Sequence, residues 1–300
     1  MNKWVKRTSV ALVTLVLLGV AATVVGKAMG ERKMARNVVL QVRTLDVVPD
    51  PARIEHGRYL YNTRGCAECH GADGAGKIVV KDGSMLVVAP NITAGTNGTT
   101  TAYKVVDWVR TVRHGVKPNG NPVMMMPSED YSRFTDEDMA ALVAYLQQMR
   151  PVPGNRAAIE VPAQVKALYA FGMIKDASEK IDHKQGPIRA VSAAVTPEYG
   201  AYVANACIGC HGATLSGGRI PGTPPSWPAA ANLTRGKGSA MVRYPTPDAF
   251  MAMLRTGHRP DGKPISPVMP FGSLKQMNDT DAQALYAYLK TVPAREAGRH

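Results

Sequence analysis

The longest apolar run in the chain covers residues 8–26, which include no charged side chain. Basic residues flank this run on both sides, at Lys3, Lys6, Arg7 and Lys27. A helix of this length spans about 30 Å, which is the thickness of the hydrocarbon core of a membrane. We therefore expect residues 1–36 to contain a single transmembrane helix.

A cleaved signal peptide is the alternative explanation of this segment, because Gly19, Val20 and Ala21 are small enough to form a cleavage site. We favour the retained anchor, since the apolar run continues to Val25 and contains no Ala-x-Ala sequence. Either kind of segment would direct the rest of the chain out of the cytoplasm.

Hydrophobic residues at helical spacing predict three longer helices after this segment. The first starts at Pro51, because Asp50 suits the N-cap and proline is favoured at the first helical position. The second covers residues 103–112. The third follows a capping box at residues 135–138 and ends before Pro151.

Two stretches lack this regular pattern. Residues 71–102 are rich in Gly, Asn and Thr, so we expect loops there.

Residues 153–192 begin as an extended, proline-containing linker, and the tract 180–186 is expected to be solvated. Helical spacing predicts one short amphipathic helix in this segment, from Val165, Leu168, Tyr169 and Ile174. We interpret the segment as a connector that packs across a domain boundary, and the alternative is a surface for a partner.

The second half of the chain repeats landmarks of the first at an offset of 141 to 143 residues. The matching pairs are Cys66 and Cys207, Asn91 and Asn232, Trp108 and Phe250, Gly115 and Gly257, Met126 and Met269, Asp136 and Asp279, and Tyr145 and Tyr288. So small a drift over so many landmarks indicates a tandem duplication of one fold. We therefore expect one domain in residues 37–152, a linker in 153–192 and a second domain in 193–300.

Composition and charge are consistent with two exported domains. A length of 300 residues is enough for two modest cores, and 28 Gly with 22 Pro indicate a loop-rich protein. Of the formal net charge of +13, residues 1–36 contribute +6 (seven Lys or Arg, one Glu), which leaves +7 for the remainder. The basic residues are dispersed, which argues against nucleic acid and allows an acidic protein partner or anionic lipid headgroups.

Both repeats contain a Cys-x-x-Cys-His sequence, and together the two copies use all four cysteines of the chain. This spacing is typical of covalent haem attachment, in which two cysteines bond the vinyl groups and the histidine becomes the proximal iron ligand. The alternatives are a redox dithiol, a four-cysteine zinc site or two disulfides, none of which requires the histidine. We therefore expect two covalently bound c-type haems, on Cys66, Cys69 and His70 and on Cys207, Cys210 and His211.

With these motifs, the sequence resembles the class I cytochrome c family, and especially the membrane-bound multihaem subunits that accept electrons from periplasmic dehydrogenases. The resemblance covers about residues 50–150 and 193–292. It implies an all-α fold of two tandem class I cytochrome c domains after one N-terminal transmembrane helix.

The same resemblance implies that the motif histidine and a methionine before a proline bind each iron from opposite faces. On this chain, His70 then pairs with Met126, and His211 pairs with Met269. A thioether raises the potential of the iron, which suits a high-potential electron carrier. Met125 and Met124 are alternatives to Met126, and Met277 is the alternative to Met269.

Other polar residues have less certain roles in the sequence. Arg113 and Arg255 occupy equivalent positions where each is able to bond a haem propionate, although ordinary solvated arginines are an equal alternative. Asn91 and Asn232 either bond near the cofactor or shape turns. The remaining histidines are expected to be surface or capping residues: His56, His114, His183, His258 and His300.

Six ligands on each iron leave no open position for a substrate, so we expect an electron-transfer protein rather than an enzyme. It would relay single electrons between a periplasmic or membrane dehydrogenase and a downstream respiratory acceptor, with redox proteins as partners. A dihaem peroxidase is the alternative, and it needs one iron that can lose a ligand. A docking subunit inside a larger respiratory complex is a third hypothesis.

The expected location is the bacterial inner membrane, crossed once, with both haem domains in the periplasm. Charge does not settle this orientation, because basic residues lie at both ends of the apolar run. The cofactor does, since haem attachment of this kind takes place outside the cytoplasmic membrane.

Overall fold

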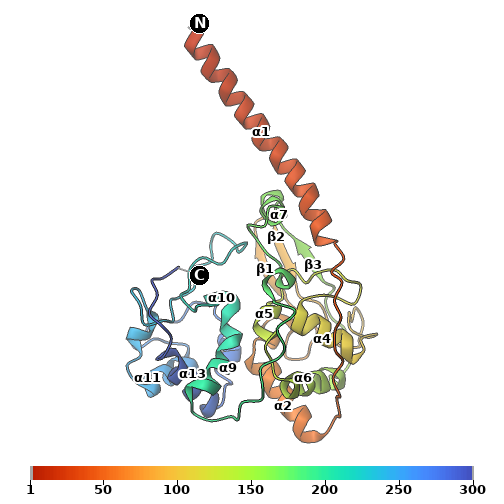
Figure 1. The fold of residues 1–300 in the computed structure, drawn as a ribbon, viewed down its shortest axis with the longest axis vertical. Coiled ribbons are helices and arrows are strands. Elements are labelled where there is room, and N and C mark those ends of the chain that lie inside the picture. The colour runs from red at the N-terminus through yellow and green to blue at the C-terminus, as the bar shows by residue number, and fades with distance from the viewer. Residues whose placement is uncertain (1–2, 299–300) are drawn as a thin grey trace.

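The apolar N-terminal run lies within one continuous helix, α1 (Lys3–Met34), in the computed structural model, which describes residues 3–298. The helix projects away from the rest of the molecule (Figure 1). Its most apolar stretch of 18 residues has a mean hydropathy of 2.4 and is almost entirely exposed. By length and composition α1 is a candidate membrane span, as the sequence predicts.

The first lobe, which we define as α2 to α6, contains the first Cys-x-x-Cys-His motif. Its helices are α2 (Pro51–Thr63), α3 (Cys66–His70), α4 (Val105–His114), α5 (Ser128–Tyr131) and α6 (Asp136–Gln148). The predicted start of α2 is confirmed, since Asp50 Oδ1 accepts the Arg53 backbone N–H at 3.0 Å. The apolar faces of α2, α4 and α6 form one core, with Tyr61, Val109 and Met139 buried at its centre.

The second lobe, which we define as α9 to α13, repeats this arrangement. Its elements are α9 (Pro197–Val203), the 3-10 helix η1 (Ala204–Cys207), α10 (Ile208–His211), the 3-10 helix η2 (Ala240–Arg243), α11 (Pro247–Thr256), α12 (Phe271–Leu274) and α13 (Asp279–Leu289). It has a core of its own, in which Val203, Leu254 and Leu289 are buried. The two lobes lie side by side (Figure 1), as expected from a duplicated fold.

A close helix crossing is the first feature that both lobes share. In the first lobe α2 packs against α6 at Gly57, and a Cβ built there would overlap the Ala141 carbonyl group. In the second lobe α9 packs against α13 at Gly200, and a Cβ there would overlap the Ala284 carbonyl group. Each glycine therefore allows two helix backbones to approach more closely than a side chain permits.

A small antiparallel sheet corrects the all-α prediction. In the described part of the chain it has three strands in the order β1 (Ile78–Asp82), β2 (Met85–Val88) and β3 (Ala158–Glu160). The prediction of loops over residues 71–102 is therefore wrong for this hairpin. Val80, Met85 and Val87 are buried on one face, and Trp227 of the second lobe packs against them. Strands β1 and β2 pair locally across a tight turn at Gly83, so Asp82-Gly83 between apolar residues is the signal that could have identified the hairpin. Only the pairing of β2 with β3 joins residues about seventy positions apart.

The connector between the lobes contains β3 and two short helices, α7 (Ala163–Ala170) and α8 (Ala177–Lys180). The predicted amphipathic helix corresponds to α7. It packs against α1 rather than only across the boundary between the lobes. The chain after α7 then returns to the first lobe, where Lys180 Nζ lies 2.6 Å from Glu129 Oε1. The connector thus joins the N-terminal helix to the first lobe.

The close crossing in the first lobe predicts the effect of Gly57→Ala. Helix propensity alone would favour alanine by about 1 kcal/mol. The new methyl group would meet the backbone of α6, which cannot rotate aside as a side chain can. We therefore expect a net loss of about 1–3 kcal/mol in the free energy of unfolding, measured by denaturant titration of the haem-loaded protein.

Gly186→Ala is the control for this substitution, because a Cβ at Gly186 meets no atom within 4 Å and its φ is not positive. We expect a change within about 0.5 kcal/mol. Equal free energies of unfolding for the two variants would contradict the packing described at Gly57.

Candidate functional site

Each Cys-x-x-Cys-His motif forms a short helical turn that places its two cysteines and its histidine together. The first is α3 and ends at Gly71, with φ 80°. The second is formed by η1 and α10 and ends at Gly212, with φ 76°. A left-handed glycine directly after the histidine lets the chain leave the turn sharply in both lobes.

The two motif histidines make the same hydrogen bond. Nδ1 of His70 lies 3.0 Å from the Pro90 carbonyl oxygen, and Nδ1 of His211 lies 2.8 Å from the Ala231 carbonyl oxygen. A carbonyl accepts only from an Nδ1–H group, so Nε2 carries the free lone pair. Burial lowers the pKa of both imidazoles, which favours the neutral form. A neutral imidazole held in this tautomer by a backbone carbonyl is typical of a metal-bound histidine.

The surroundings of the cysteines bear on one of the alternative chemistries, the redox dithiol. All four are unpaired, and the described residues contain no group of three or more His, Cys, Asp or Glu side chains suited to a metal ion. Burial raises the pKa of Cys66 and of Cys207 to about 12. A redox dithiol requires a lowered thiol pKa, which is the opposite shift. The raised thiol pKa therefore argues against the redox dithiol among the alternatives.

The methionine loops have matching geometry in the two lobes. The Ser128 N–H donates to the Met126 carbonyl oxygen at 2.9 Å, and the Phe271 N–H donates to the Met269 carbonyl oxygen at 2.7 Å. The prolines that follow have nearly identical backbone angles, φ −79° and ψ 66° at Pro127 against φ −74° and ψ 65° at the equivalent proline. This correspondence supports Met126 as the partner of Met269 in the repeat.

Packing separates Met126 from Met125 but does not separate Met269 from Met277, which is itself buried in the core of the second lobe. Met126 contacts the core of the first lobe, as Cys66 does, and Met269 contacts the core of the second lobe, as Cys207 does. Met125 is 41% exposed, which does not suit an iron ligand within a lobe. The residues present thus fit one haem in each lobe, and the pairing of His70 with Met126 and of His211 with Met269 stays a prediction.

The structure gives Arg113 and Arg255 partners other than the haem motifs. Arg113 is buried, and its guanidinium group contacts Asp136 Oδ1 and the Phe134 carbonyl oxygen, each at 3.0 Å. Arg255 contacts Asp279 Oδ1 at 2.7 Å, in the equivalent place. Both arginines therefore hold the segment that precedes the last helix of their lobe. A role in binding propionates stays a prediction.

Asn91 and Asn232 are turn residues in this structure. Each is buried, accepts the backbone N–H two residues later, and donates to two backbone carbonyls. The two sets of bonds are equivalent in the two lobes. The turn interpretation of the sequence accounts for these contacts.

The remaining described histidines have local partners. His56 Nε2 lies 2.6 Å from Asp138 Oδ1, and the rings of His114 and His183 meet through their Nδ1 atoms at 3.2 Å. Burial, followed by the proximity of His183, lowers the pKa of His114 to about 4. His258 contacts the Thr256 carbonyl oxygen at 2.9 Å. His300 lies outside the described residues.

Two reciprocal pairs of hydrogen bonds join the lobes. The Tyr59 hydroxyl donates to Asp281 Oδ2 at 2.8 Å and accepts the Asn278 N–H at 3.1 Å. The Tyr202 hydroxyl donates to Asp138 Oδ2 and accepts the Thr135 N–H. Each tyrosine thus binds the N-terminus of the last helix in the other lobe.

This interface was not predicted from the sequence. In the predicted capping box, only Thr135 caps the helix, and Asp138 takes part in the interface instead. Thr135 does accept the Asp138 N–H at 3.0 Å. The Asp138 carboxylate, however, is turned toward Tyr202 and His56 of the adjoining elements. Both tyrosines and both aspartates are related by an offset of 143 residues, which is the signal that could have identified them.

One contact of the interface has no counterpart. Arg64 Nη2 lies 2.6 Å from Asp281 Oδ2, and the two side chains are only 3% and 1% exposed. Burial alone would raise the pKa of Asp281, but the charge of Arg64 and the hydrogen bonds of Tyr199 and Tyr59 hold this pKa below its usual value. The carboxylate is therefore ionised, and it is held by both lobes.

The haem motif of each lobe faces the methionine loop of the other. The Gly209 N–H, inside the second motif, donates to Asp130 Oδ1 of α5 at 2.6 Å. In the first motif, the Glu68 carboxylate lies against Gly272 of α12. Burial raises the pKa of Cys210 to about 11, and Cys69 of the other motif is among the nearby groups that raise it further. The two candidate haem sites are therefore neighbours across the interface.

Comparison with known proteins agrees with this geometry. The family model described as Cytochrome c matches the chain twice, over residues 54–150 and 198–293. The fructose dehydrogenase cytochrome subunit of Gluconobacter japonicus is 26% identical over 297 residues, covering 86% of this chain and 57% of that protein.

Two further relatives extend the comparison. The cytochrome c subunit of the quinone-dependent alcohol dehydrogenase of Gluconobacter oxydans is 24% identical over 278 residues, covering 84% of this chain and 57% of that subunit. The cbb3-type cytochrome c oxidase subunit CcoP of Helicobacter pylori is 28% identical over 122 residues, covering 40% of this chain and 36% of that subunit. The chain thus spans little more than half the length of the two relatives that match most of it.

The buried ion pair predicts the effect of Asp281→Asn. Removing the carboxylate leaves the Arg64 guanidinium buried without a counterion, so we expect a loss of about 3–5 kcal/mol in the free energy of unfolding. The lowered pKa of Asp281 also sets how the free energy of unfolding depends on pH. The stabilisation from ionised Asp281 is fully present above the pKa of an unfolded aspartate, about 3.9. It is lost as the pH falls through the lower pKa that Asp281 has in the folded protein.

Asp138→Asn is the matched control, because it removes the equivalent carboxylate without leaving a buried arginine unpaired. We expect a loss of only about 1 kcal/mol there. Denaturant unfolding of both variants at neutral and acid pH gives the comparison. If Asp281→Asn is no worse than Asp138→Asn, or if its stability still falls with acid as the unmodified protein's does, the pair does not hold the lobes together.

Proposed function

Because the chain belongs to the cytochrome c family, we propose that it relays single electrons between a periplasmic or membrane dehydrogenase and a downstream respiratory acceptor. The observation that carries this proposal is that each lobe contains a motif histidine bonded through Nδ1 to a backbone carbonyl and a methionine loop packed on the same core as the motif. Haem c, when bound, supplies reversible one-electron iron chemistry. The residues of this chain supply its attachment, its ligands and its surroundings.

Each lobe has its own residues for haem attachment and for iron ligation. Cys66 and Cys69 in the first lobe, and the equivalent cysteines in the second, would hold one haem each through thioether bonds. His70 and His211 would each donate Nε2, because Nδ1 is already bonded to a backbone carbonyl. The two methionine sulfurs would fill the opposite positions, which leaves no site for oxygen, peroxide or an organic substrate. This filled coordination favours a relay over the dihaem peroxidase.

The interface between the lobes supports transfer between two sites in one chain. The motifs lie on either side of partly buried contacts between the lobes, so their separation is set by packing rather than by a flexible linker. A carrier that receives an electron at one site and releases it at the other requires such a fixed arrangement. We infer that the two lobes act as one electron path.

The relatives indicate the kind of partner. They are named as cytochrome subunits of a fructose dehydrogenase and an alcohol dehydrogenase, and as a subunit of a cbb3-type cytochrome c oxidase. We propose that this chain likewise works in a membrane complex, with α1 retained as the anchor and both lobes in the periplasm. Proteins that co-purify from detergent-solubilised membranes would test this: a dehydrogenase or oxidase supports the complex, and a chain that migrates alone contradicts it.

The ligand assignment predicts which substitutions open the iron to an external ligand. In Met126→Ala and in Met269→Ala the sixth position of one haem is empty, so the reduced protein should bind about one equivalent of carbon monoxide. The same variants should lose about half of the sulfur-to-iron charge-transfer absorption in the oxidised state. The unmodified protein should bind none.

Two neighbouring methionines are the controls. Met125→Ala and Met277→Ala remove a thioether close to the first and the second loop respectively, and both variants should retain the charge-transfer absorption of the unmodified protein. If Met125→Ala loses that absorption, the first ligand is misassigned. If the unmodified reduced protein binds carbon monoxide rapidly and stoichiometrically, the relay is wrong and the peroxidase is favoured.

A further inference from the structure

We propose that the turn that ends α7 is a second membrane contact beside α1. We call residues 168–173 the α7 tip. Leu168, Phe171 and Met173 of this tip would enter the boundary between lipid headgroups and acyl chains. The proposal rests on the membrane anchoring by α1 proposed above, and it adds the α7 tip as a second segment in contact with lipid.

The first support is the close packing of α7 on the end of α1. A Cβ built on Gly26 would lie 2.6 Å from Ala167 Cβ and 3.3 Å from the Phe171 ring. One turn further along α1, a Cβ on Gly30 would overlap the Lys166 carbonyl group. Glycines four residues apart therefore form a flat strip on which α7 rests.

These contacts also fix the direction of α7. Moving from Gly30 back to Gly26 on α1 corresponds to moving from Lys166 forward to Phe171 on α7, so the two helices are antiparallel. The α7 tip consequently lies beside Gly26, where the uncharged run of α1 ends. If residues 8–26 span the hydrocarbon core, the tip lies at its boundary.

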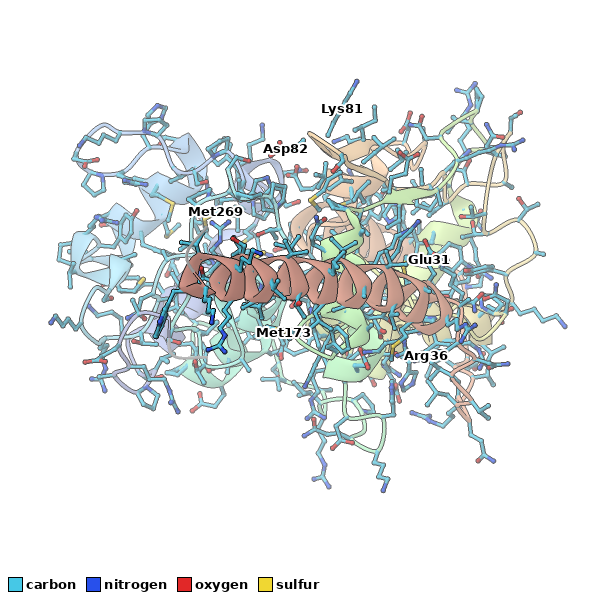
Figure 2. The ribbon with its side chains drawn as sticks, turned by 90° about the horizontal axis from the view of Figure 1, so that it is seen from above. Glu31, Arg36, Lys81, Asp82, Met173 and Met269 are labelled. Carbon is cyan, nitrogen blue, oxygen red and sulfur yellow. The ribbon has the colours of Figure 1, made fainter. Side chains whose placement is uncertain are left out.

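The second support is the exposure of large apolar side chains at this place. Leu168 is 37% exposed, Phe171 is 58% exposed and Met173 is 68% exposed. The Met173 N–H donates to the Leu168 carbonyl oxygen at 2.9 Å, and Gly172 has φ 76°, so the backbone between them forms a tight turn. Figure 2 labels Met173 in the view from above, and α7, which ends shortly before it, packs against α1.

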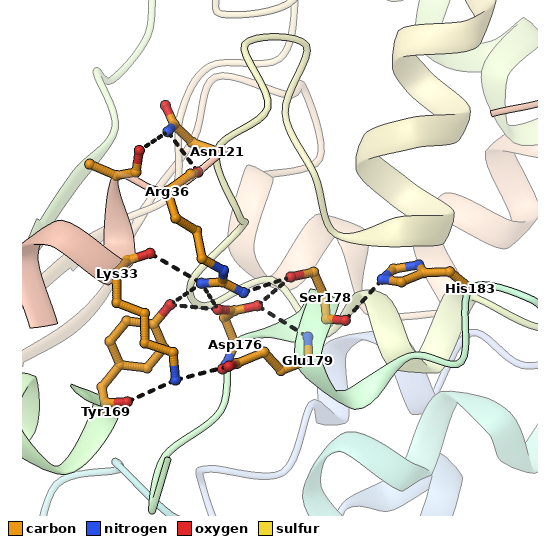
Figure 3. A network of polar contacts seen from close by, with 9 residues as sticks. Lys33, Arg36, Asn121, Tyr169, Asp176, Ser178, Glu179 and His183 are labelled. Carbon is orange, nitrogen blue, oxygen red and sulfur yellow. Dashed lines mark hydrogen bonds and ion pairs between the residues drawn. The ribbon is translucent and has the colours of Figure 1, made fainter. Parts of the chain in front are cut away.

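The third support is a polar network that prevents the tip from swinging away from α1 (Figure 3). Lys33 Nζ lies 2.9 Å from the Tyr169 carbonyl oxygen and 2.8 Å from Glu179 Oε1. Arg36 Nη1 lies 2.7 Å from Asp176 Oδ2, a carboxylate with no exposed side-chain surface. The end of α1, α7 and α8 are thus one rigid unit.

Continuity with α1 identifies lipid as the occupant rather than another protein. The tip adjoins the apolar surface of the proposed span without a polar gap, because Phe171 touches Gly26 itself. Lys27 and Lys175 follow the two apolar segments in sequence and suit anionic headgroups. Apolar residues beside a span, followed by basic ones, are the composition of a membrane interface.

Spin labels on single introduced cysteines test the proposal in the full-length haem-loaded protein, whose native cysteines are occupied by thioether bonds. The protein is placed in vesicles of phosphatidylethanolamine and phosphatidylglycerol. The measurement is the ratio of label accessibility to oxygen and to a water-soluble nickel complex. We expect this ratio to be several-fold higher for Met173→Cys than for Val242→Cys, an equally apolar and 77% exposed position in the second lobe.

A third label separates this inference from the anchoring on which it rests. Leu17→Cys lies in the middle of the apolar run and should give the highest ratio of the three. A high ratio at Leu17 with equal, low ratios at Met173 and Val242 overturns the membrane contact and leaves the anchor intact. Equal, low ratios at all three positions overturn the anchor, and the contact with it.

Discussion

The reciprocal bonds of Tyr59 with Asp281 and of Tyr202 with Asp138 are the constraint on which the candidate electron path depends. Each tyrosine hydroxyl binds a backbone N–H and a carboxylate at a helix N-terminus, where a partial positive charge stabilises the anion. Because the two contacts are equivalent, the lobes are related by an approximate twofold arrangement. Each haem motif consequently faces the methionine loop of the other lobe.

The duplication is not perfect, and its main difference falls at this interface. Cys66 lies nine positions after Gly57, whereas Cys207 lies seven positions after Gly200, and the chain between Gly200 and Cys207 leaves α9 for the 3-10 helix η1. Arg64 lies in the longer segment, so the second lobe has no equivalent guanidinium group. The contact between the lobes is therefore symmetric except for one ion pair, in which Arg64 of the first lobe binds Asp281 of the second.

Sequence patterns predicted the elements that depend on neighbours in the chain. The helix start at Asp50, the helices around residues 103–112 and 136–148, and the duplication all follow from local spacing or from self-similarity. The haem motifs were identified in the same way, since attachment needs two cysteines and a histidine within five residues. The ligand methionines were assigned through their repeat and the family resemblance, and the structure adds matching loop geometry.

The features that could not be predicted pair residues far apart in the sequence. The strand pairing of Leu86 with Glu160 and the contact of Gly26 with Ala167 leave only weak local traces, a few alternating apolar residues and two small ones. Arg113 shows the same limit, because a buried arginine at a helix end serves a carboxylate as well as a propionate, and only the fold shows that Asp136 is there. A sequence pattern indicates whether a segment is a helix or a strand, but it does not indicate which residue a polar side chain will contact.

The contacts between α1, α7 and the two lobes determine how the lobes are oriented relative to the membrane. A flexible tether would let the lobes sample many orientations at the membrane, and few of these would bring a motif toward a membrane-bound donor. Here α1 packs on α7 without a side chain between them at Gly26, and the chain after α1 is held to the first lobe where the Val38 N–H donates to the Gly120 carbonyl oxygen at 2.8 Å. The buried pair of Arg64 and Asp281 then extends this fixed orientation to the second lobe. If α1 spans the membrane, both candidate haem sites are therefore held in one defined orientation to it.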